Sequence, residues 1–343
     1  MEPSDMASVI VQEQLESETA HDTNIAVVIP CYRVRDQIDA VLSAMGPDVS
    51  LIYCIDDACP ENSGDVIERI AKRDSRIRLI RHQENSGVGG AVLEGYRQAI
   101  RDGADILVKI DGDGQMDPGQ IGRITGPIRS GDADYVKGNR FFRLEGLRAM
   151  PWVRLAGNAG LSFLTKLSTG YWDLFDPTNG FTAIHVSVAK SLPLDKISKR
   201  YFFESDILFR LNTLRAVVAD VPMTAVYGDD QSSLNVVRSL FEFSVGHGRN
   251  TVKRLFYNYF LRNFSMASIH LVVGTVLLLF GTAFGATHWI HSARIGQTTP
   301  PGTVMLAALP LILGSQFLLN FIAFDMANIP RNPIHRRLER DNA

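Results

Sequence analysis

A short acidic segment, KIDGDGQMDP at residues 109–118, carries residue types that could bind a metal ion. Asp111, Asp113 and Gln115 stand two positions apart, so in an extended segment their side chains point the same way. Carboxylate and amide oxygens are hard ligands that suit Mg²⁺ or Mn²⁺, and such an ion is usually completed by water and by substrate phosphates. One interpretation of the segment is therefore a divalent metal site that receives a phosphorylated ligand.

Two other interpretations of this segment have to be weighed. A plain loop also fits, because Gly112 and Gly114 allow a turn and Asp is common in turns. A calcium loop of the EF-hand kind does not fit, because the twelfth position counted from Asp111 is Gly122, where a bidentate Glu is needed. The segment alone leaves the loop and the metal site open.

The chain before residue 237 alternates apolar runs of strand length with helical patterns. The runs are IAVVIP (25–30), LIYCIDD (51–57), IRLIRH (77–82) and ADILVKIDGD (104–113). Continuous apolar strands separated by helices predict an α/β fold, in which a mostly parallel sheet is covered by helices on both faces. Ligands of such sheets bind beyond the carboxyl ends of the strands. The residues that fall at these ends form one predicted rim: Pro30, Asp56, Asp57, Asn85, Asp111 and Asp113.

A glycine-rich segment, NSGVGGAV at residues 85–92, follows the third of these runs. It is not a dinucleotide fingerprint, because Val92 stands where the last Gly or Ala of that motif belongs, and no GxxxxGK sequence marks a P-loop. Gly87 to Gly90 instead predict a close backbone approach and an open helix N-terminus, which favours a phosphate group.

The composition limits the classes of protein to consider. The 343 residues suffice for one large domain or two ordinary ones, and the net charge of −2 argues against a broad nucleic-acid surface. Cys31, Cys54 and Cys59 form no CxxC pair, so we expect reduced thiols in a cytosolic domain, the first two inside strands. Residues 1–23 contain no Lys or Arg and predict a disordered acidic tail.

Two apolar stretches near the C-terminus, at residues 265–290 and 303–326, contain no Lys or Arg. Both exceed the roughly 20 residues that span a bilayer. Leu and Val lie all round the first stretch rather than along one stripe, which disfavours a pair of buried helices in a soluble protein. We therefore expect a two-helix transmembrane hairpin at residues 265–324.

Basic residues flank this hairpin on one side. Lys253, Arg254 and Arg262 precede it, and Arg331, Arg336, Arg337 and Arg340 follow it, whereas only Arg294 lies between the two spans. The asymmetry places both ends of the hairpin in the cytoplasm. The expected division is a cytoplasmic domain at 24–237, interfacial amphipathic helices at 238–264, the hairpin, and a basic cytoplasmic tail at 325–343.

Six segments in order resemble the family 2 glycosyltransferases. They are VVIPCY, IDDACPENSGD, NSGVGGAVLEGYRQA, DGDGQMDP, VKGNRF and DPTNGF. The most similar branch is that of the dolichol- or polyprenyl-phosphate hexose synthases. The two spans near the C-terminus also resemble the architecture of that branch. The resemblance implies a GT-A fold, a divalent Mg²⁺ or Mn²⁺ ion, and inverting transfer of a hexose from a nucleotide-sugar to a polyprenyl monophosphate at the membrane.

The resemblance also implies roles for single residues. The metal would be bound by Asp111, Asp113 and Gln115, with Asp111 also at the substrate. The nucleotide-sugar would contact Pro30, Tyr32, Asp57, Asn85 and Gly87. Phosphates would be held by Arg140 and Arg154, and Asp176 would form the floor of the sugar pocket. The chain departs from the branch at Thr182, where Arg is frequent, and at RVRD (33–36), where Asn–Glu is common.

The need for a general base depends on the acceptor. A sugar hydroxyl attacks poorly unless a carboxylate takes its proton, and Glu204 and Asp176 are the candidates. A lipid monophosphate is already mostly ionised near neutral pH, because its second pKa is about 6 by analogy with phosphorylated side chains. Transfer to a hydroxyl of a lipid-linked glycan stays an alternative. An inactive scaffold that binds nucleotide-sugar and recruits a flippase is a second one, and a homo-oligomer is also open.

Overall fold

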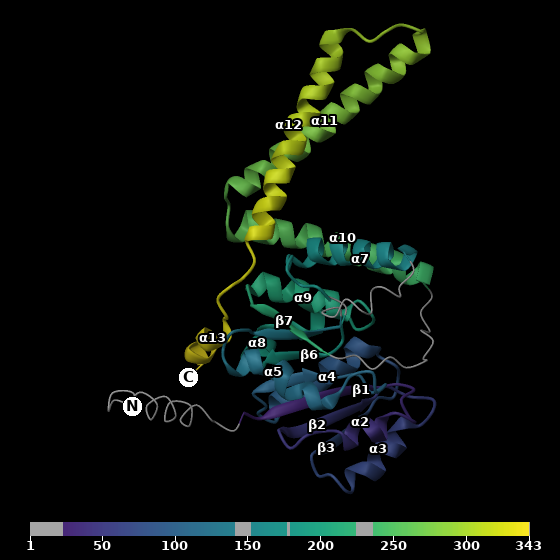
Figure 1. The fold of residues 1–343 in the computed structure, drawn as a ribbon, viewed down its shortest axis with the longest axis vertical. Coiled ribbons are helices and arrows are strands. Elements are labelled where there is room, and N and C mark those ends of the chain that lie inside the picture. The colour runs from purple at the N-terminus through teal and green to yellow at the C-terminus, as the bar shows by residue number, and fades with distance from the viewer. Residues whose placement is uncertain (1–22, 141–151, 177–178, 224–235, 343) are drawn as a thin grey trace, which may run out of the picture.

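The computed structural model describes residues 23–140, 152–176, 179–223 and 236–342, with the backbone alone at 152–159, 236–241 and 341–342. Nearly all of the predicted acidic tail lies outside the described residues. The described part forms a sheet domain, a pair of long helices across it, and a helical hairpin that projects away from it (Figure 1).

The predicted sheet has seven strands in the order β3-β2-β1-β4-β6-β5-β7. The strands are β1 (Ile25–Cys31), β2 (Val49–Asp56), β3 (Ile77–Arg81), β4 (Ile106–Lys109), β5 (Tyr135–Asn139), β6 (Thr182–His185) and β7 (Val218–Pro222). All neighbouring strands are parallel except β6, which runs antiparallel to both β4 and β5. The mostly parallel sheet is therefore confirmed. Cys31 and Cys54 lie within strands as expected.

Helices cover both faces of the sheet because apolar side chains leave each strand on alternate sides. Ile25, Val27 and Ile29 of β1 pack on one side, whereas Ala26 and Val28 pack on the other. The first side is covered by α2 (Ile38–Ser43), α3 (Ser63–Ala71) and α5 (Ile121–Arg129), which η1 (Pro118–Gln120) directly precedes. The second side is covered by α4 (Val88–Arg101), α8 (Val186–Ser191), η2 (Leu194–Lys196) and α9 (Phe203–Leu214).

Two long helices lie side by side on top of α9, between the sheet domain and the hairpin (Figure 1). They are α7 (Trp152–Thr169) and α10 (Val236–Phe256), and a π-helical turn, η3 (Tyr257–Arg262), continues α10. The outer side of α10 and η3 exposes large apolar residues: Val245, Val252, Phe256, Tyr257 and Leu261. Exposed apolar groups at the base of an apolar hairpin are typical of helices that lie in a membrane interface.

The hairpin consists of α11 (Met266–Ile295) and α12 (Pro301–Ala327), both long and apolar enough to cross a membrane. Only 11% of the most apolar 18-residue window of each helix is buried, so these are not core helices of a soluble domain. The helices approach closely where a Cβ on Gly274 would lie 3.1 Å from the Gly314 carbonyl oxygen. Small residues at such crossings allow tight packing where lipid offers no hydrophobic drive.

Asp325, at the end of α12, connects the hairpin to α10 and η3. Its carboxylate accepts two hydrogen bonds from Arg254 at 2.7 and 2.8 Å, one from Tyr259 at 2.5 Å and one from Trp172 at 2.8 Å. Arg254 and Asp325 are both buried. Breaking one side of a buried ion pair typically costs about 3–5 kcal/mol. The Arg254–Asp325 pair therefore contributes strongly to the attachment of α12 to α10.

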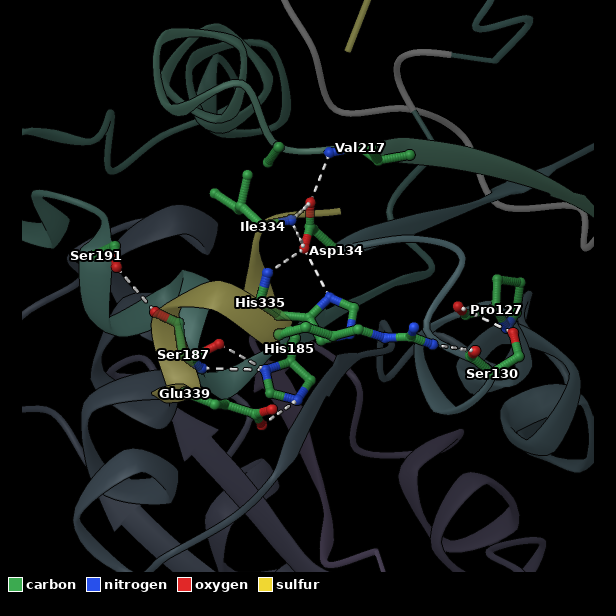
Figure 2. Close-up of polar contacts among 12 residues, drawn as sticks. Pro127, Ser130, Asp134, His185, Ser187, Ser191, Val217, Ile334, His335 and Glu339 are labelled. Carbon is green, nitrogen blue, oxygen red and sulfur yellow. Dashed lines mark hydrogen bonds and ion pairs between the residues drawn. The ribbon is translucent and has the colours of Figure 1, made fainter. Parts of the chain in front are cut away.

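The chain after α12 returns to the sheet domain and docks there through α13 (His335–Asn342) (Figure 2). The buried Asp134 carboxylate accepts the backbone N–H groups of Ile334 and His335, each at 2.9 Å, and lies 2.7 Å from His335 Nδ1. His335 also stacks on His185, with ring centroids 4.6 Å apart. The sequence predicts only a basic tail here, because the Asp134 carboxylate that contacts His335 lies 201 residues earlier in the chain.

Candidate active site

The predicted rim forms where β1, β2 and β4 end side by side. Val28 of β1 is opposite Lys109 of β4, and Cys31 is opposite Asp56 of β2, so the segments that follow these strands leave the sheet together. The backbone is strained directly after β1 and β2: Arg33 and Ala58 have φ of 59° and 53°, in the left-handed region. Strained non-glycine residues often gather at functional sites, because the surrounding structure has to hold them there.

The acidic segment after β4 forms a turn that needs its glycines. Gly114 has a φ of +77°, and the Asp113 carboxylate accepts the backbone N–H of Gln115 at 3.0 Å. A Cβ on Gly112 would lie 3.3 Å from the side chains of Ile29 and Val34, so the turn packs directly on the core. The turn thus presents Asp111, Asp113 and Gln115 half-buried at the end of the strand.

These side chains fit Mg²⁺ or Mn²⁺. All three offer oxygen, the donor that these ions prefer. Within the described ranges, no group of three or more His, Cys, Asp or Glu side chains is arranged to hold a metal ion. An ion bound at Asp113 and Gln115 would have to be completed by water or by ligand phosphates, as is common for Mg²⁺.

A buried lysine that the sequence does not mark as a site residue joins the metal-site acid Asp111 to the candidate base Glu204. Lys109 Nζ lies 3.0 Å from Asp111 Oδ1 and 3.1 Å from Glu204 Oε1. Burial alone would lower the pKa of Lys109, but the charges of Asp111 and Glu204 outweigh it and raise the pKa above its ordinary value. The amine is therefore a permanent cation between two carboxylates.

Gly180 explains why the acid and the lysine can approach each other. A Cβ at this position would lie 2.5 Å from both Asp111 Oδ2 and Lys109 Nζ, so any side chain would displace the ion pair. Gly180 belongs to the DPTNGF segment, in which the family resemblance implies a role only for Asp176.

A second buried lysine, Lys137 on β5, lies in the same row of the sheet. Thr182 on β6 is opposite both Lys109 and Lys137, so the two amines flank it on one face. Lys137 donates to the Asn179 carbonyl at 2.6 Å, and burial lowers its pKa to about 8. Thr182, where the chain departs from the pattern of the polyprenyl-phosphate branch, therefore lies between two buried cations.

Asp176 and Arg140 are brought together as a two-pronged ion pair. Arg140 Nε lies 2.8 Å from Asp176 Oδ2, and Arg140 Nη2 lies 3.1 Å from Asp176 Oδ1. Asp176 is fully buried. Arg140, which is expected to hold a phosphate, therefore contacts Asp176, which is expected to form the floor of the sugar pocket. The side chain of Arg154 lies outside the described residues, although its backbone belongs to α7.

Asp57, expected to contact a base, binds the loop before α4 in the structure. It is 2% exposed, and its carboxylate accepts the backbone N–H groups of Ser86 and Gly87, both at 2.8 Å, while His82 Nδ1 lies 2.8 Å away. Burial acts to raise the pKa of Asp57, but these hydrogen bonds outweigh it and lower the pKa. Asn85 donates to the Asp57 carbonyl at 3.1 Å, so it serves the same loop.

The glycine segment contacts protein where a phosphate was expected. Gly90 N–H donates to the Lys199 carbonyl at 2.9 Å, and Gly87, at a φ of +85°, has the same carbonyl 2.6 Å from where its Cβ would be. Part of the predicted phosphate cradle is thus occupied by the loop before α9. Pro30 is half-buried at the end of β1, and Tyr32 beside it is 43% exposed at the rim.

Glu204 and Asp206, two positions apart, point to different neighbours because both lie on α9, where residues at this spacing do not face each other. Glu204 faces Lys109, whereas the buried Asp206 accepts the Ser198 N–H and the Asn250 side chain, both at 2.9 Å. Asp206 therefore links the loop before α9 to α10 and has a structural role.

Comparison with known proteins shows which family and which relatives the chain resembles. The family model described as glycosyl transferase family 2 matches residues 26–192. An undecaprenyl-phosphate mannosyltransferase of Micrococcus luteus is 30% identical over 208 residues, which are 59% of this chain and 83% of that protein. A UDP-N-acetylglucosamine–dolichyl-phosphate N-acetylglucosaminyltransferase of Methanococcus voltae is 29% identical over 219 residues, 60% and 87% of the two chains.

Solved structures share the fold at low sequence identity. Glucosyl-3-phosphoglycerate synthase from Mycobacterium tuberculosis, in complex with Mn²⁺, UDP and its product, has a TM-score of 0.51 at 18% identity and covers 69% of this chain and 81% of its own. Mannosyl-3-phosphoglycerate synthase from Rubrobacter xylanophilus has a TM-score of 0.52 at 15% identity, covering 71% and 77%. The sheet and its helices are thus of the GT-A kind.

Proposed function

Because the chain belongs to glycosyl transferase family 2, we propose that it transfers a hexose, with inversion, from a nucleotide-sugar to a polyprenyl monophosphate at the cytoplasmic face of a membrane. The relatives named above are polyprenyl- or dolichyl-phosphate sugar transferases, which supports this acceptor class. The hairpin and the exposed apolar side of α10 support a site close to the bilayer.

The observation that carries the acceptor class is that both candidate bases already have cationic partners. Glu204 is bound to the buried Lys109, and Asp176 is bound to Arg140. A proton placed on Glu204 would remove one of the two charges that stabilise the Lys109 ammonium in a dry environment. An acceptor hydroxyl would need such a proton transfer. A lipid monophosphate, already ionised near neutral pH, would not.

The residues of the site would then divide the work. When bound, a divalent ion would supply positive charge to the nucleotide diphosphate as it leaves, with Asp113 and Gln115 as ligands. Lys109 would hold the Asp111 and Glu204 side chains in position, one on each side of its amine. Arg140, beside Asp176, would orient the acceptor phosphate, since a guanidinium matches phosphate oxygens.

The test supplies purified protein with undecaprenyl phosphate, or with an undecaprenyl-linked glycan that offers only hydroxyls, and a panel of nucleotide-sugars. We expect sugar transfer to the lipid phosphate, slowed only modestly in Glu204→Gln and more strongly in Arg140→Ala. Activity should fall at acidic pH as the acceptor takes up its second proton. Transfer to the hydroxyl acceptor alone, abolished in Glu204→Gln and normal in Arg140→Ala, would refute the lipid-phosphate acceptor.

A further inference from the structure

A cleft of about 330 Å³ lies between the loop before α9 and the middle of α10, outside the metal turn. The residues that line it come from two segments: Ser198, Lys199, Arg200, Tyr201 and Phe202 from the loop, and Glu242, Phe243, Val245, Gly246 and Arg249 from α10. The reaction proposed above uses none of them.

The charge of this cleft is positive. Lys199, Arg200 and Arg249 are exposed and line it, against the single carboxylate of Glu242. Within the described ranges, no hydrogen bond or ion pair joins these three cationic side chains to another residue. His247, buried next to the cleft, adds no charge at neutral pH because burial lowers its pKa to about 4. The cleft thus offers three cations to an anionic group.

The walls of the cleft are apolar as well as charged. Phe202 packs on Phe243 and on His247, with ring centroids 6.0 and 5.0 Å apart, and Gly246 leaves room for the Phe202 ring. Tyr201 and Val245 are each 55% exposed at the opening. Further along α10 the apolar exposure continues at Val252 and Phe256, toward the base of the hairpin.

From this combination we infer that the cleft binds the phosphate headgroup of an anionic phospholipid of the surrounding membrane, distinct from the acceptor. Cations beside exposed aromatic and aliphatic groups, on a helix at the interface, complement a molecule that is anionic at its head and apolar behind it. A free phosphate would use the cations and leave Tyr201 and Val245 in water. The binding inference does not depend on the proposed function.

An occupied cleft would also act on the site, because its loop supports the catalytic rim. The Lys199 carbonyl accepts the N–H of Gly90 at the start of α4, and Phe203 packs against Gly89. Glu204 follows two residues after Phe202. A headgroup that holds Lys199 and Arg200 would therefore restrict the segment that places Glu204 against Lys109.

The experiment measures binding of short-chain, spin-labelled phosphatidylglycerol and phosphatidylcholine to the full chain in a non-ionic detergent, without donor or acceptor. We expect tighter binding of phosphatidylglycerol, weakened about fivefold by Arg249→Gln and again by Arg200→Gln. Lys253→Gln is the matched control, because it removes the same charge from an exposed position of α10 outside the cleft. It should leave binding unchanged. Size-exclusion profiles and melting temperatures would check that the variants fold.

Four results would overturn the inference. Equal binding of both lipids would remove the need for an anionic headgroup. Equal loss in Lys253→Gln would indicate a diffuse basic surface instead of a cleft. Displacement by millimolar inorganic phosphate would indicate a free-anion site. Displacement by undecaprenyl phosphate far below the phosphatidylglycerol concentration would assign the cleft to the acceptor. Because no turnover is measured, failure here leaves the proposed function untouched, and failure of transfer leaves this binding result untouched.

Discussion

Single residues in the site are held by charge pairs that join distant parts of the chain. Asp111 and Asp113 could be found from the sequence, because their spacing and the glycines between them lie within one short segment. Lys109 could not, since a lysine after three apolar residues resembles the exposed end of a strand, and its partner Glu204 lies 95 residues away. The Arg140–Asp176 pair is a third case, in which both residues were identified but their contact was not.

The metal ligands can be tested by removing the ion and the carboxylate separately. EDTA should abolish transfer, and Asp113→Asn should slow it at least about tenfold, equivalent to about 1.4 kcal/mol of barrier. Asp117→Asn is the matched control, because this nearby exposed carboxylate accepts the Gly119 backbone N–H and the Gln120 side chain at the start of η1. Mn²⁺ binding followed by electron paramagnetic resonance should weaken in Asp113→Asn alone. Full activity of Asp113→Asn in EDTA would disprove the metal assignment.

The Lys109 ion pairs predict a double-mutant result. Lys109→Met should destabilise the fold by up to about 3–5 kcal/mol, because it leaves the half-buried Asp111 and Glu204 carboxylates without their buried cation. Adding Glu204→Gln should recover part of that loss, since the amide carries no charge to compensate. Denaturant unfolding of the four proteins of the cycle measures the coupling. Additive effects of the two substitutions would show that Lys109 and Glu204 do not stabilise each other.

Elements position the site through their ends rather than through their lengths. The periodicity of the sequence predicts the strands well because each needs only a local pattern, and the apolar runs at 25–30, 51–57, 77–82 and 104–113 overlap β1 to β4. The antiparallel direction of β6 was not predicted. TAIH is too short to show a direction, and only its partners β4 and β5 decide it. The docking of α10 on the loop before α9 likewise depends on contacts that no periodicity encodes.

Two glycines of α10 test that docking. A Cβ on Gly246 would lie 2.8 to 3.0 Å from ring atoms of Phe202, whereas Gly248 has nothing within 4 Å of such an atom. Gly248→Ala should therefore stabilise the protein by up to about 1 kcal/mol through helix propensity. Gly246→Ala should lose that gain to overpacking, which costs about 1–3 kcal/mol, and should displace the loop that leads to Glu204. Thermal unfolding and transfer rates compare the two. Equal behaviour would show that Phe202 yields without cost.

The whole molecule is organised around the return of the chain from the hairpin to the sheet domain. Arg254 and Tyr259 bind Asp325 at the end of α12, and Asp134 contacts His335 in the segment that follows α12. Both contacts place the residues after the hairpin on the same side as the sheet. The basic residues of the sequence predict the same arrangement and, in addition, a cytoplasmic location, which the contacts within one chain do not address.

Orientation across the membrane can be measured with single introduced cysteines, because Cys31, Cys54 and Cys59 are all buried and should give little background. Gln297→Cys lies in the exposed turn between α11 and α12, and Arg123→Cys lies on the exposed surface of α5. A membrane-impermeant maleimide should label Gln297→Cys in intact cells and Arg123→Cys only after lysis, because basic flanks are retained in the cytoplasm. Labelling of both after lysis is the control for reactivity. The reverse pattern in intact cells would place the acidic turn on the side away from cytoplasmic nucleotide-sugars, and the proposed donor would then have no access to Asp113.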